Sequence, residues 1–232
     1  MGVTGSLPLG PEVDPTPAEK PGPVTLPGRT GSVTRLDAAR HGPDLWETLC
    51  GHDDVWAYLP VGPFVDRASF AAWLAEREAS TWPYYFYAIL DAGGRAVGLS
   101  SLMEYRPAMR VIEIGHIVYS PALQRTPLGT EAQYLLARYA FETLRYRRYE
   151  WKCHALNSRS RRAALRYGFT FEGIFRQHMI VKGRSRDTAW FSMLDTEWPA
   201  RKAAFEGWLA PENFGPDGRQ KASLAALNGR QP

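Results

Sequence analysis

Residues 111–142 read VIEIGHIVYSPALQRTPLGTEAQYLLARYAFE, which predicts a strand, a short loop and a helix in direct succession. Residues 111–119 are rich in β-branched side chains, which pack well on a pleated sheet, and Pro121 ends the strand because proline has no N–H for the ladder. Apolar residues with helical spacing follow at Ala132, Leu135, Leu136, Tyr139 and Ala140. The helix is therefore expected to open at Thr130 and Glu131.

The loop before this helix has the character of a phosphate-binding site. A helix start carries backbone N–H groups without partners and a partial positive charge, so it favours an anion. Gly129 lets a ligand approach the backbone closely. The candidate binding residues are Gln124, Arg125, Thr126, Leu128, Gly129 and Thr130. For the loop alone, an ordinary strand–loop–helix crossover without a ligand is the alternative.

The same loop resembles the pyrophosphate loop of the GNAT superfamily of acyl-CoA-dependent N-acyltransferases, which runs Gln/Arg-x-x-Gly-x-Gly/Ala. Gln124 fills its first position and Gly129 its last, whereas Pro127 occupies the place of the first glycine. Because proline lacks an N–H, the resemblance implies a diphosphate held by one fewer backbone hydrogen bond, or by a shifted one. The continuation Thr130-Glu131-Ala132 is similar to the RimJ/RimL branch, which includes the ribosomal-protein N-terminal acetyltransferases.

A second motif of that superfamily follows in the right order. Asn157 and Ser160 resemble its Asn-x-x-Ser pattern, and Gly168 and Phe169 its closing Gly-Phe pair. Asn157 suits a helix N-cap, and Gly168 suits the left-handed position after the helix end. With both motifs present, residues 33–195 are identified as a member of the superfamily.

The resemblance implies an α/β (α+β) fold: one domain with a mixed, mostly antiparallel central sheet of about seven strands, splayed at the acyl-CoA site and flanked by helices. Residues 84–90 and 95–104 predict a hairpin around Asp91-Ala92-Gly93-Gly94. Residues 148–155 alternate aromatic and charged side chains, which indicates a strand with one buried face rather than an RNA-binding surface. A last hairpin is expected over 169–181 and 186–194.

Three zones are expected along the chain. Residues 1–30 hold seven prolines and five glycines, which predicts a surface tail without regular structure. Residues 31–210 form the acyltransferase domain, with Asp66 as a helix cap, and residues 211–232 a loosely held C-terminal tail. By the resemblance, the aromatic loop from Trp56 to Phe64 is the first candidate for acceptor selection, with simple core packing as the alternative.

Composition excludes several classes of protein. The net charge is +4, which is far from a nucleic-acid-binding signature. No apolar run approaches the ~20 residues of a membrane span, and no signal peptide is evident. Two cysteines are too few for a disulfide framework, so a cytoplasmic location is expected. Monomer and homodimer both remain open.

The resemblance also implies the co-substrate, acetyl-CoA, and no metal. Its pantetheine arm would lie between two strands that end near Tyr119 and His154, against Val118 and Tyr119. Gly115 is a candidate for a bulge that opens this gap and frees a backbone N–H for an oxyanion.

Direct acyl transfer requires a base for the amine and an acid for the departing thiolate. Ser160 is the candidate acid because it occupies the motif's serine position, with a capping role as the alternative. Glu113 is the candidate base. His116 would point away from Glu113 unless a bulge intervenes, and His178 is a weaker candidate. Cys153 is expected to be a buried, inert thiol rather than a nucleophile.

The sequence therefore predicts transfer of an acetyl group from acetyl-CoA to a primary amine, by direct attack in a ternary complex. The acceptor is a small molecule or a protein N-terminus. The alternatives are a longer donor such as succinyl-CoA, or a non-catalytic acyl-CoA-binding or RNA-binding module on the same fold.

Overall fold

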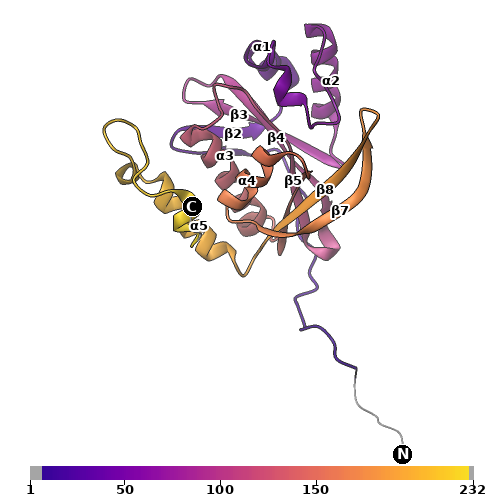
Figure 1. The fold of residues 1–232 in the computed structure, drawn as a ribbon, viewed down its shortest axis with the longest axis vertical. Coiled ribbons are helices and arrows are strands. Elements are labelled where there is room, and N and C mark those ends of the chain that lie inside the picture. The colour runs from indigo at the N-terminus through magenta and orange to yellow at the C-terminus, as the bar shows by residue number, and fades with distance from the viewer. Residues whose placement is uncertain (1–6, 230–232) are drawn as a thin grey trace, which may run out of the picture.

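The computed structural model describes residues 7–229, and its centre is an eight-stranded sheet in the order β1-β2-β3-β4-β5-β6-β8-β7 (Figure 1). The strands are β1 Thr25–Pro27, β2 Gly31–Arg35, β3 Tyr84–Asp91, β4 Ala96–Arg106, β5 Val111–Tyr119, β6 Arg148–His154, β7 Thr170–Val181 and β8 Arg184–Leu194. Neighbouring strands are antiparallel except β5 and β6, which are parallel. The expected mixed, mostly antiparallel sheet is confirmed.

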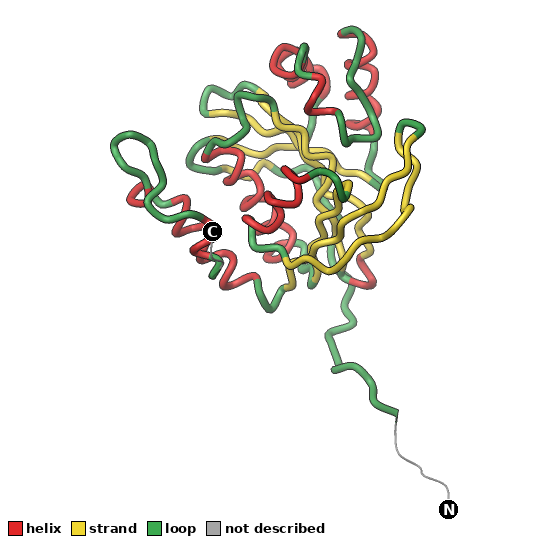
Figure 2. The backbone as a smooth tube through the Cα atoms, in the orientation of Figure 1, coloured by secondary structure: helices red, strands yellow, loops and turns green. Residues whose placement is uncertain are grey.

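Helices cover both faces of this sheet (Figure 2). They are α1 Ala38–Leu49, α2 Arg67–Ala79, α3 Pro127–Arg138, α4 Ser158–Arg166, α5 Trp198–Leu209 and α6 Leu224–Leu227, with a π-helical turn at Tyr139–Thr143. Short 3-10 turns lie at η1 Asp53–Trp56, η2 Pro107–Met109 and η4 Pro211–Asn213. None of the helices between residues 7 and 229 is long and apolar enough to cross a membrane.

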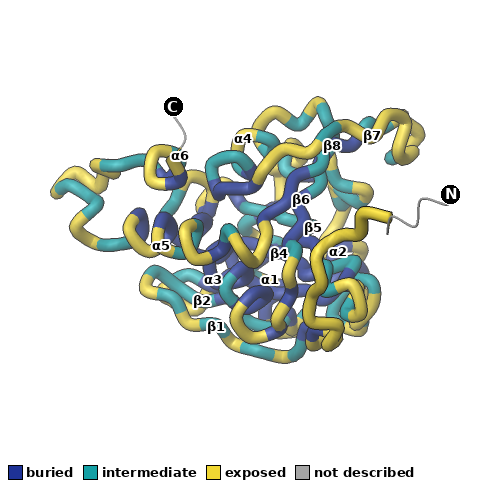
Figure 3. The backbone as a smooth tube through the Cα atoms, turned by 90° about the horizontal axis from the view of Figure 1, so that it is seen from below, coloured by how far each residue is buried: buried dark blue, intermediate teal, exposed yellow. Residues whose placement is uncertain are grey.

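Two apolar cores result from the alternation of side chains along the strands. One core, under α1 and α2, includes Leu45, Phe70, Trp73, Phe86 and Leu99. The other, under α3, α4 and α5, includes Ile114, Leu135, Tyr149, Ala164 and Phe205. The middle strands β4, β5 and β6 are buried between these layers (Figure 3). Because α1 and α2 pack mainly against β3 and β4, that layer leaves the β6–β8 part of the same face open for a site.

Strands β5 and β6 diverge halfway along their length. Their parallel ladder runs from Val111 paired with Arg148 to Ile114 paired with Trp151. Beyond that point β5 continues to Tyr119 and β6 to His154 without pairing with each other. The splay expected between these two strands is therefore present.

A bulge lies on β5 where the divergence begins. Ser101 pairs with Gly115, but Leu99 pairs with Val118, so one residue of β4 opposes two residues of β5. His116 has φ of 46°, the left-handed region. The extra residue is thus His116 rather than Gly115. The bulge cancels the alternation, so that Glu113 and His116 line the same cavity.

The segment before β2 is packed on the domain, in contrast to the expected tail. β1 pairs with β2 and accounts for the eighth strand. The Glu131 carboxylate accepts hydrogen bonds from the Arg29 N–H at 2.7 Å, the Thr30 N–H at 2.7 Å and the Thr30 hydroxyl. Ala18 is buried, and residues 7–17 are exposed. Proline and glycine did not prevent a strand here because short edge strands tolerate them.

One helix begins earlier than the sequence predicts. α3 begins at Pro127, not at Thr130, because proline is well suited to the first helical position, where its missing N–H leaves no hydrogen bond unmade. α1 begins at Ala38 after the cap Asp37, with Pro43 inside the helix. The cap Asp66 of α2 and the cap Asn157 of α4 are as expected.

Residues after Pro211 add further structure to the C-terminal end. Trp208 donates to the Gln220 side chain at 2.7 Å, and Leu224 of α6 is buried. Arg201 of α5 donates to the Asn228 carbonyl at 3.1 Å. α5 and α6 therefore pack together beside α3 and α4.

Candidate active site

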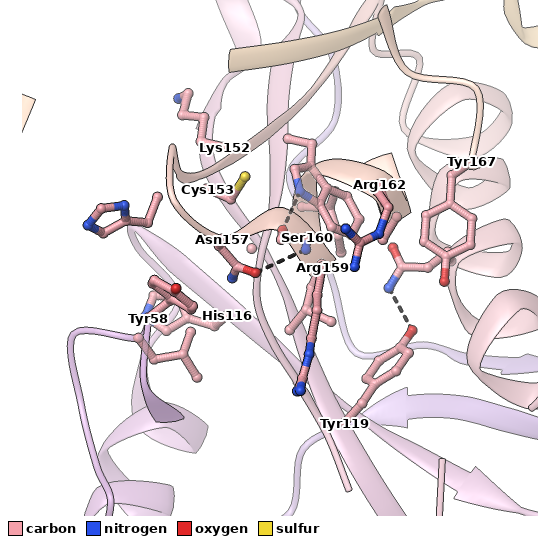
Figure 4. A pocket seen from close by; sticks show the side chains of 18 of the residues that line it. Tyr58, His116, Tyr119, Lys152, Cys153, Asn157, Arg159, Ser160, Arg162 and Tyr167 are labelled. Atoms are coloured by element: carbon pink, nitrogen blue, oxygen red, sulfur yellow. Dashed lines mark hydrogen bonds between the residues drawn. The ribbon is translucent and has the colours of Figure 1, made fainter. Parts of the chain in front are cut away.

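The gap between β5 and β6 opens into a cavity of about 1540 Å³. Its lining extends from the start of α3, past the start of α4, to the η1 loop and the β7–β8 hairpin. In Figure 4, Tyr58 and His116 lie on one side of Ser160 and Asn157, and Tyr119, Arg162 and Tyr167 lie on the other. The cavity thus connects two chemically different ends.

The first end is formed by the loop and first turn of α3. The Thr126 hydroxyl accepts from the Gly129 N–H at 3.1 Å and caps the helix. A Cβ at Gly129 would lie 2.9 Å from the Leu123 carbonyl oxygen and 3.1 Å from Tyr119 Cε2, so only glycine fits there without displacement. Gln124 donates to the Tyr119 carbonyl at 2.9 Å. Gly129, Gln124 and Thr126 therefore hold the loop against the end of β5.

Three arginines border this end and pair with no carboxylate among residues 7–229. Arg125 and Arg162 are exposed and line the cavity. Arg166 donates to the Thr130 hydroxyl at 3.0 Å and lies over the Trp208 ring. Burial lowers the pKa of Arg166, although its guanidinium remains charged at neutral pH. This end of the cavity is a positively charged site beside a helix N-terminus, which suits phosphate groups.

The start of α4 lies at the middle of the cavity. Asn157 Oδ1 accepts from the Ser160 N–H at 3.0 Å, so Asn157, not Ser160, is the cap. The Ser160 hydroxyl accepts from Trp151 Nε1 at 3.0 Å (Figure 4). Cys153 is buried, and burial raises the pKa of its thiol while a hydrogen bond with Ser160 opposes that shift. A raised pKa agrees with an inert thiol.

At the second end, a buried carboxylate cluster surrounds Lys152. Lys152 Nζ lies 2.8 Å from Glu113 Oε2 and 3.0 Å from Glu150 Oε2. Glu150 also pairs with Arg106 and Arg148. Its pKa is lowered, because these cations outweigh the burial that raises it.

The pKa of Glu113 is shifted in the opposite direction to that of Glu150. Its side chain is 7% exposed, and burial raises its pKa to about 7 even though Lys152 lowers it. A carboxylate with a pKa near the working pH can accept a proton at one step and release it at another. Glu113 also lines the cavity, so the candidate base predicted from the sequence lies where a ligand can reach it.

His116 and His178 lie near this end. His116 packs edge-on against Tyr84 with ring centroids 4.7 Å apart. Burial lowers the pKa of His116 to about 4, so the ring is neutral at pH 7. His178 shares a hydrogen bond with the Thr188 hydroxyl at 3.0 Å.

The remaining candidate residues are distributed around the cavity. The Val118 side chain is buried in the core under α1 and α2, and Leu128 is buried in the other core. Tyr119 lines the cavity, and its hydroxyl donates to the Gly129 carbonyl and accepts from Gln133. Val118 and Leu128 could therefore contact a ligand only through the backbone or by movement.

The aromatic loop from Trp56 to Phe64 contributes some side chains to the core and others to the cavity. Trp56 and Phe64 pack in the core, whereas Tyr58 lines the cavity and contacts His154 with ring centroids 5.3 Å apart. The tip of the β7–β8 hairpin closes against this loop, because Lys182 donates to the Trp56 carbonyl at 2.9 Å.

Sequence reasoning missed Lys152, Arg186 and Trp190, which all line this end of the cavity. Lys152 could have been found, because the alternation along residues 148–155 placed it on the charged face of β6. Nothing in the sequence indicated that β8 would bring Arg186 and Trp190 to the same place. The described residues contain no cluster of His, Cys, Asp and Glu side chains suited to a metal ion.

A mostly antiparallel sheet, two central strands that diverge, and a helix start beside the gap are the features expected of an N-acyltransferase fold. Residues 34–170 match the model of the acetyltransferase (GNAT) domain family. The chain belongs to this family and is a GNAT acetyltransferase.

Individual solved structures that are similar to this chain support the same family. The structure of a GCN5-related N-acetyltransferase from Brucella melitensis is 47% identical, with a TM-score of 0.90, and the match covers 92% of this chain and 98% of that one. A GNAT-family protein from Chromobacterium violaceum, described as a probable acetyltransferase, is 43% identical over 86% of this chain and 100% of that one, with a TM-score of 0.76.

A curated relative supports the RimJ/RimL-like branch. The Bacillus subtilis (strain 168) protein named "Putative ribosomal N-acetyltransferase YdaF" is 31% identical over 109 residues, which are 47% of this chain and 59% of that protein. The matched region thus spans less than two thirds of that relative.

Proposed function

We propose that this protein transfers an acetyl group from acetyl-CoA to a primary amine. The observation that carries the proposal is one cavity that joins an arginine-rich helix start to a buried carboxylate with a pKa of about 7. The first feature suits the phosphates of CoA, and the second suits deprotonation of an amine.

The charged end of the cavity fits the nucleotide part of CoA. Pro127 has no N–H, and the Gly129 N–H is already bonded to Thr126, so fewer backbone donors remain in the first turn of α3. Arg125 and Arg162, together with the Gln124 side chain, are positioned to supply the missing donors. The pantetheine arm then occupies the gap between β5 and β6, where the strands leave backbone groups unpaired.

Three groups of the protein have separate roles in the proposed acyl transfer. Glu113 accepts the proton of the amine, directly or through water, as the nitrogen forms a bond to the thioester carbonyl carbon. A backbone N–H at the His116 bulge stabilises the negative oxygen of the tetrahedral intermediate. The C–S bond then breaks, and Ser160 gives its proton to the departing thiolate and regains one from solvent. The products are the acetylated amine and CoA.

The acceptor is a small-molecule amine or a protein N-terminus. The name of the Bacillus subtilis relative favours the protein N-terminus. The cavity reaches the surface beside the exposed side chains of Tyr58 and Met179, where a peptide could enter.

The test is amine-dependent release of free CoA thiol. Purified protein is incubated with acetyl-CoA and a panel of small amines and N-terminal peptides, and both the thiol and the acetylated product are measured. We expect turnover with at least one class and a clear preference between the two. Acetyl-CoA binding by calorimetry without turnover would instead identify a non-catalytic binding protein, and preferred use of succinyl-CoA would reassign the donor.

A further inference from the structure

At the acceptor end of the cavity, Arg186 is a cation that forms no ion pair within the described part of the chain. Arg186, the third residue of β8, is half-buried and lines the cavity. Its guanidinium makes one hydrogen bond, from Nε to the Thr188 hydroxyl at 3.2 Å, and no ion pair with any carboxylate in residues 7–229. Burial lowers its pKa, which is the direction expected for an arginine partly removed from water.

The nearby acidic groups are committed elsewhere. Glu113 and Glu150 share Lys152, and Glu150 also holds Arg106 and Arg148. Asp187 follows Arg186 in sequence, but its carboxylate accepts from the Gln177 N–H at 2.6 Å. A partly buried charge without an ion-pair partner is costly, so an anionic ligand at the free face of Arg186 would be stabilised there.

The groups around Arg186 are also suited to a polar ligand. Burial is the main cause of the lowered pKa of His116, His154 and His178, and the positive charge of Arg186 lowers each of them further. His116 Nδ1 and Trp190 Nε1 are buried, line the same cavity and have no hydrogen-bond partner. Because these two atoms are fully buried, a ligand could reach them only if neighbouring side chains moved, so they are secondary to the guanidinium of Arg186.

Arg186 and Glu113 belong to one site. The charge of Glu113 acts on Arg186, and both residues line the acceptor end of the cavity. An amine placed at Glu113 therefore lies in the same cavity as this cation and within its electrostatic field. A guanidinium binds a carboxylate with two parallel hydrogen bonds, which gives both affinity and orientation.

We propose that the acceptor is an amine that also carries a carboxylate, and that Arg186 binds this carboxylate while Glu113 receives the amine. This inference rests on the proposed acetyl transfer and extends it to the class of acceptor. Free amino acids, β-alanine and short peptides with an acidic side chain near the N-terminus have the required pair of groups.

The experiment compares matched acceptors that differ only in charge. Each amino acid or acidic peptide is assayed with acetyl-CoA beside its neutral carboxamide. We expect kcat/KM to be about 10- to 100-fold higher for the best carboxylate than for its amide, as a charge-assisted bidentate contact provides. Arg186→Gln should bring this ratio close to one, mainly through a higher KM for the carboxylate acceptor.

Arg184→Gln is the matched control. Arg184 lies two residues earlier on the same strand, is exposed and has no partner in the described chain, so the same charge is removed outside the cavity. The ratio should be unchanged in this variant. Arg186→Lys keeps the charge but loses the planar fork, and should give an intermediate ratio. It also serves as the readout if Arg186→Gln does not fold.

Binding to the CoA-saturated protein, measured by calorimetry with the same acid and amide pairs, separates this inference from the proposed function. An Arg186-dependent preference in binding without any turnover would support the carboxylate site and reject acetyl transfer. Turnover of neutral amines with no carboxylate preference would support acetyl transfer and reject the carboxylate site at Arg186. If Arg186 instead determined a preference for succinyl-CoA over acetyl-CoA with a neutral amine, the carboxylate would belong to the donor and the acceptor assignment would be overturned.

Discussion

At the scale of single residues, Glu113 shows how burial and charge set a proton affinity. Loss of water raises its pKa, Lys152 lowers it, and the value of about 7 results from both. The neighbouring Glu150 has more cations around it, and its pKa is lowered. Two carboxylates that contact the same lysine are thus separated in proton affinity, and only Glu113 is suited to proton exchange near neutral pH.

Glu113→Gln should produce a defect that depends on pH. In the proposed mechanism ionised Glu113 is the base, so wild-type kcat/KM should rise as pH increases and level off above about 7. The variant should lack this step and be ~10²–10⁴-fold slower below the pKa of the amine, where free amine is scarce. Above that pKa the two rates should converge. The pH–rate profile is measured with one amine acceptor and saturating acetyl-CoA.

Ser160→Ala is the comparison for Glu113→Gln. An acid that protonates the thiolate is needed whatever the state of the amine, so this variant should be slow at high pH as well, with unchanged acetyl-CoA affinity. If Glu113→Gln lowered the rate by the same factor at every pH, Glu113 would orient the substrate rather than act as the base. Wild-type kcat in Ser160→Ala would leave Ser160 a structural role, through its hydrogen bonds with Trp151 and Cys153.

At the scale of elements, the strands and the two motif helices could be predicted from the sequence, because their signals are local. The strand over 111–119 matches β5 without a shift, and the Asn157 cap and Gly168 with φ of 96° mark the ends of α4. The start of α3 was placed three residues late, because the apolar spacing begins only after the proline and glycine of the first turn.

Other features of the site depend on pairing between distant segments and were not predictable. The position of the bulge at His116 follows from the register of β5 against β4. The contact of Lys152 with Glu113 joins residues 39 positions apart across the β5–β6 pair. Arg186 reaches the cavity only because β8 pairs with β6 outside chain order. Periodicity identifies faces of an element, but it does not identify what lies opposite them.

The arginines near the starts of α3 and α4 should determine CoA affinity. Arg162→Ala and Arg125→Ala should each weaken CoA binding by about 3- to 30-fold, the effect of one charge-assisted phosphate contact. The loss should be smaller at high salt, because the contacts are exposed. Calorimetric titration with CoA measures both effects.

The control is Arg176→Ala, an exposed arginine of β7 outside the cavity, which should leave the affinity unchanged. An undiminished CoA affinity in the double variant of Arg125 and Arg162 would show that the phosphates lie elsewhere.

At the scale of the whole molecule, the N-terminal segment joins two sides of the domain. Ala18 donates to the Pro107 carbonyl, Gly22 contacts Tyr87 and Tyr139, and β1 extends the sheet beside α3. The proline and glycine content of residues 1–30 predicted a tail. The observed contacts depend instead on where a few backbone groups meet buried side chains, which composition does not describe.

Deletion of residues 1–30 should therefore destabilise the protein, contrary to what composition alone suggests. The Glu131 carboxylate, 4% exposed, would lose the donors from Arg29 and Thr30, and the β1–β2 ladder would be absent. Lost partners for a buried charged group cost about 1–3 kcal/mol, with the lost strand in addition. For a domain of this size each kcal/mol lowers Tm by about 2–4 °C, so a decrease of roughly 5–15 °C is expected.

Deletion of residues 1–12 is the matched control, since the described part of that segment is exposed, and it should change Tm by less than about 2 °C. Glu131 belongs to the second turn of α3, whose start borders the proposed CoA site, so the longer deletion should also weaken CoA binding. Glu131→Gln in the full chain should give part of both effects, because it removes the charge but keeps the side-chain volume. Equal Tm and CoA affinity in the two deletions would show that the strap from Ala18 to Thr30 contributes nothing to the site, and would return the domain boundary to residue 31.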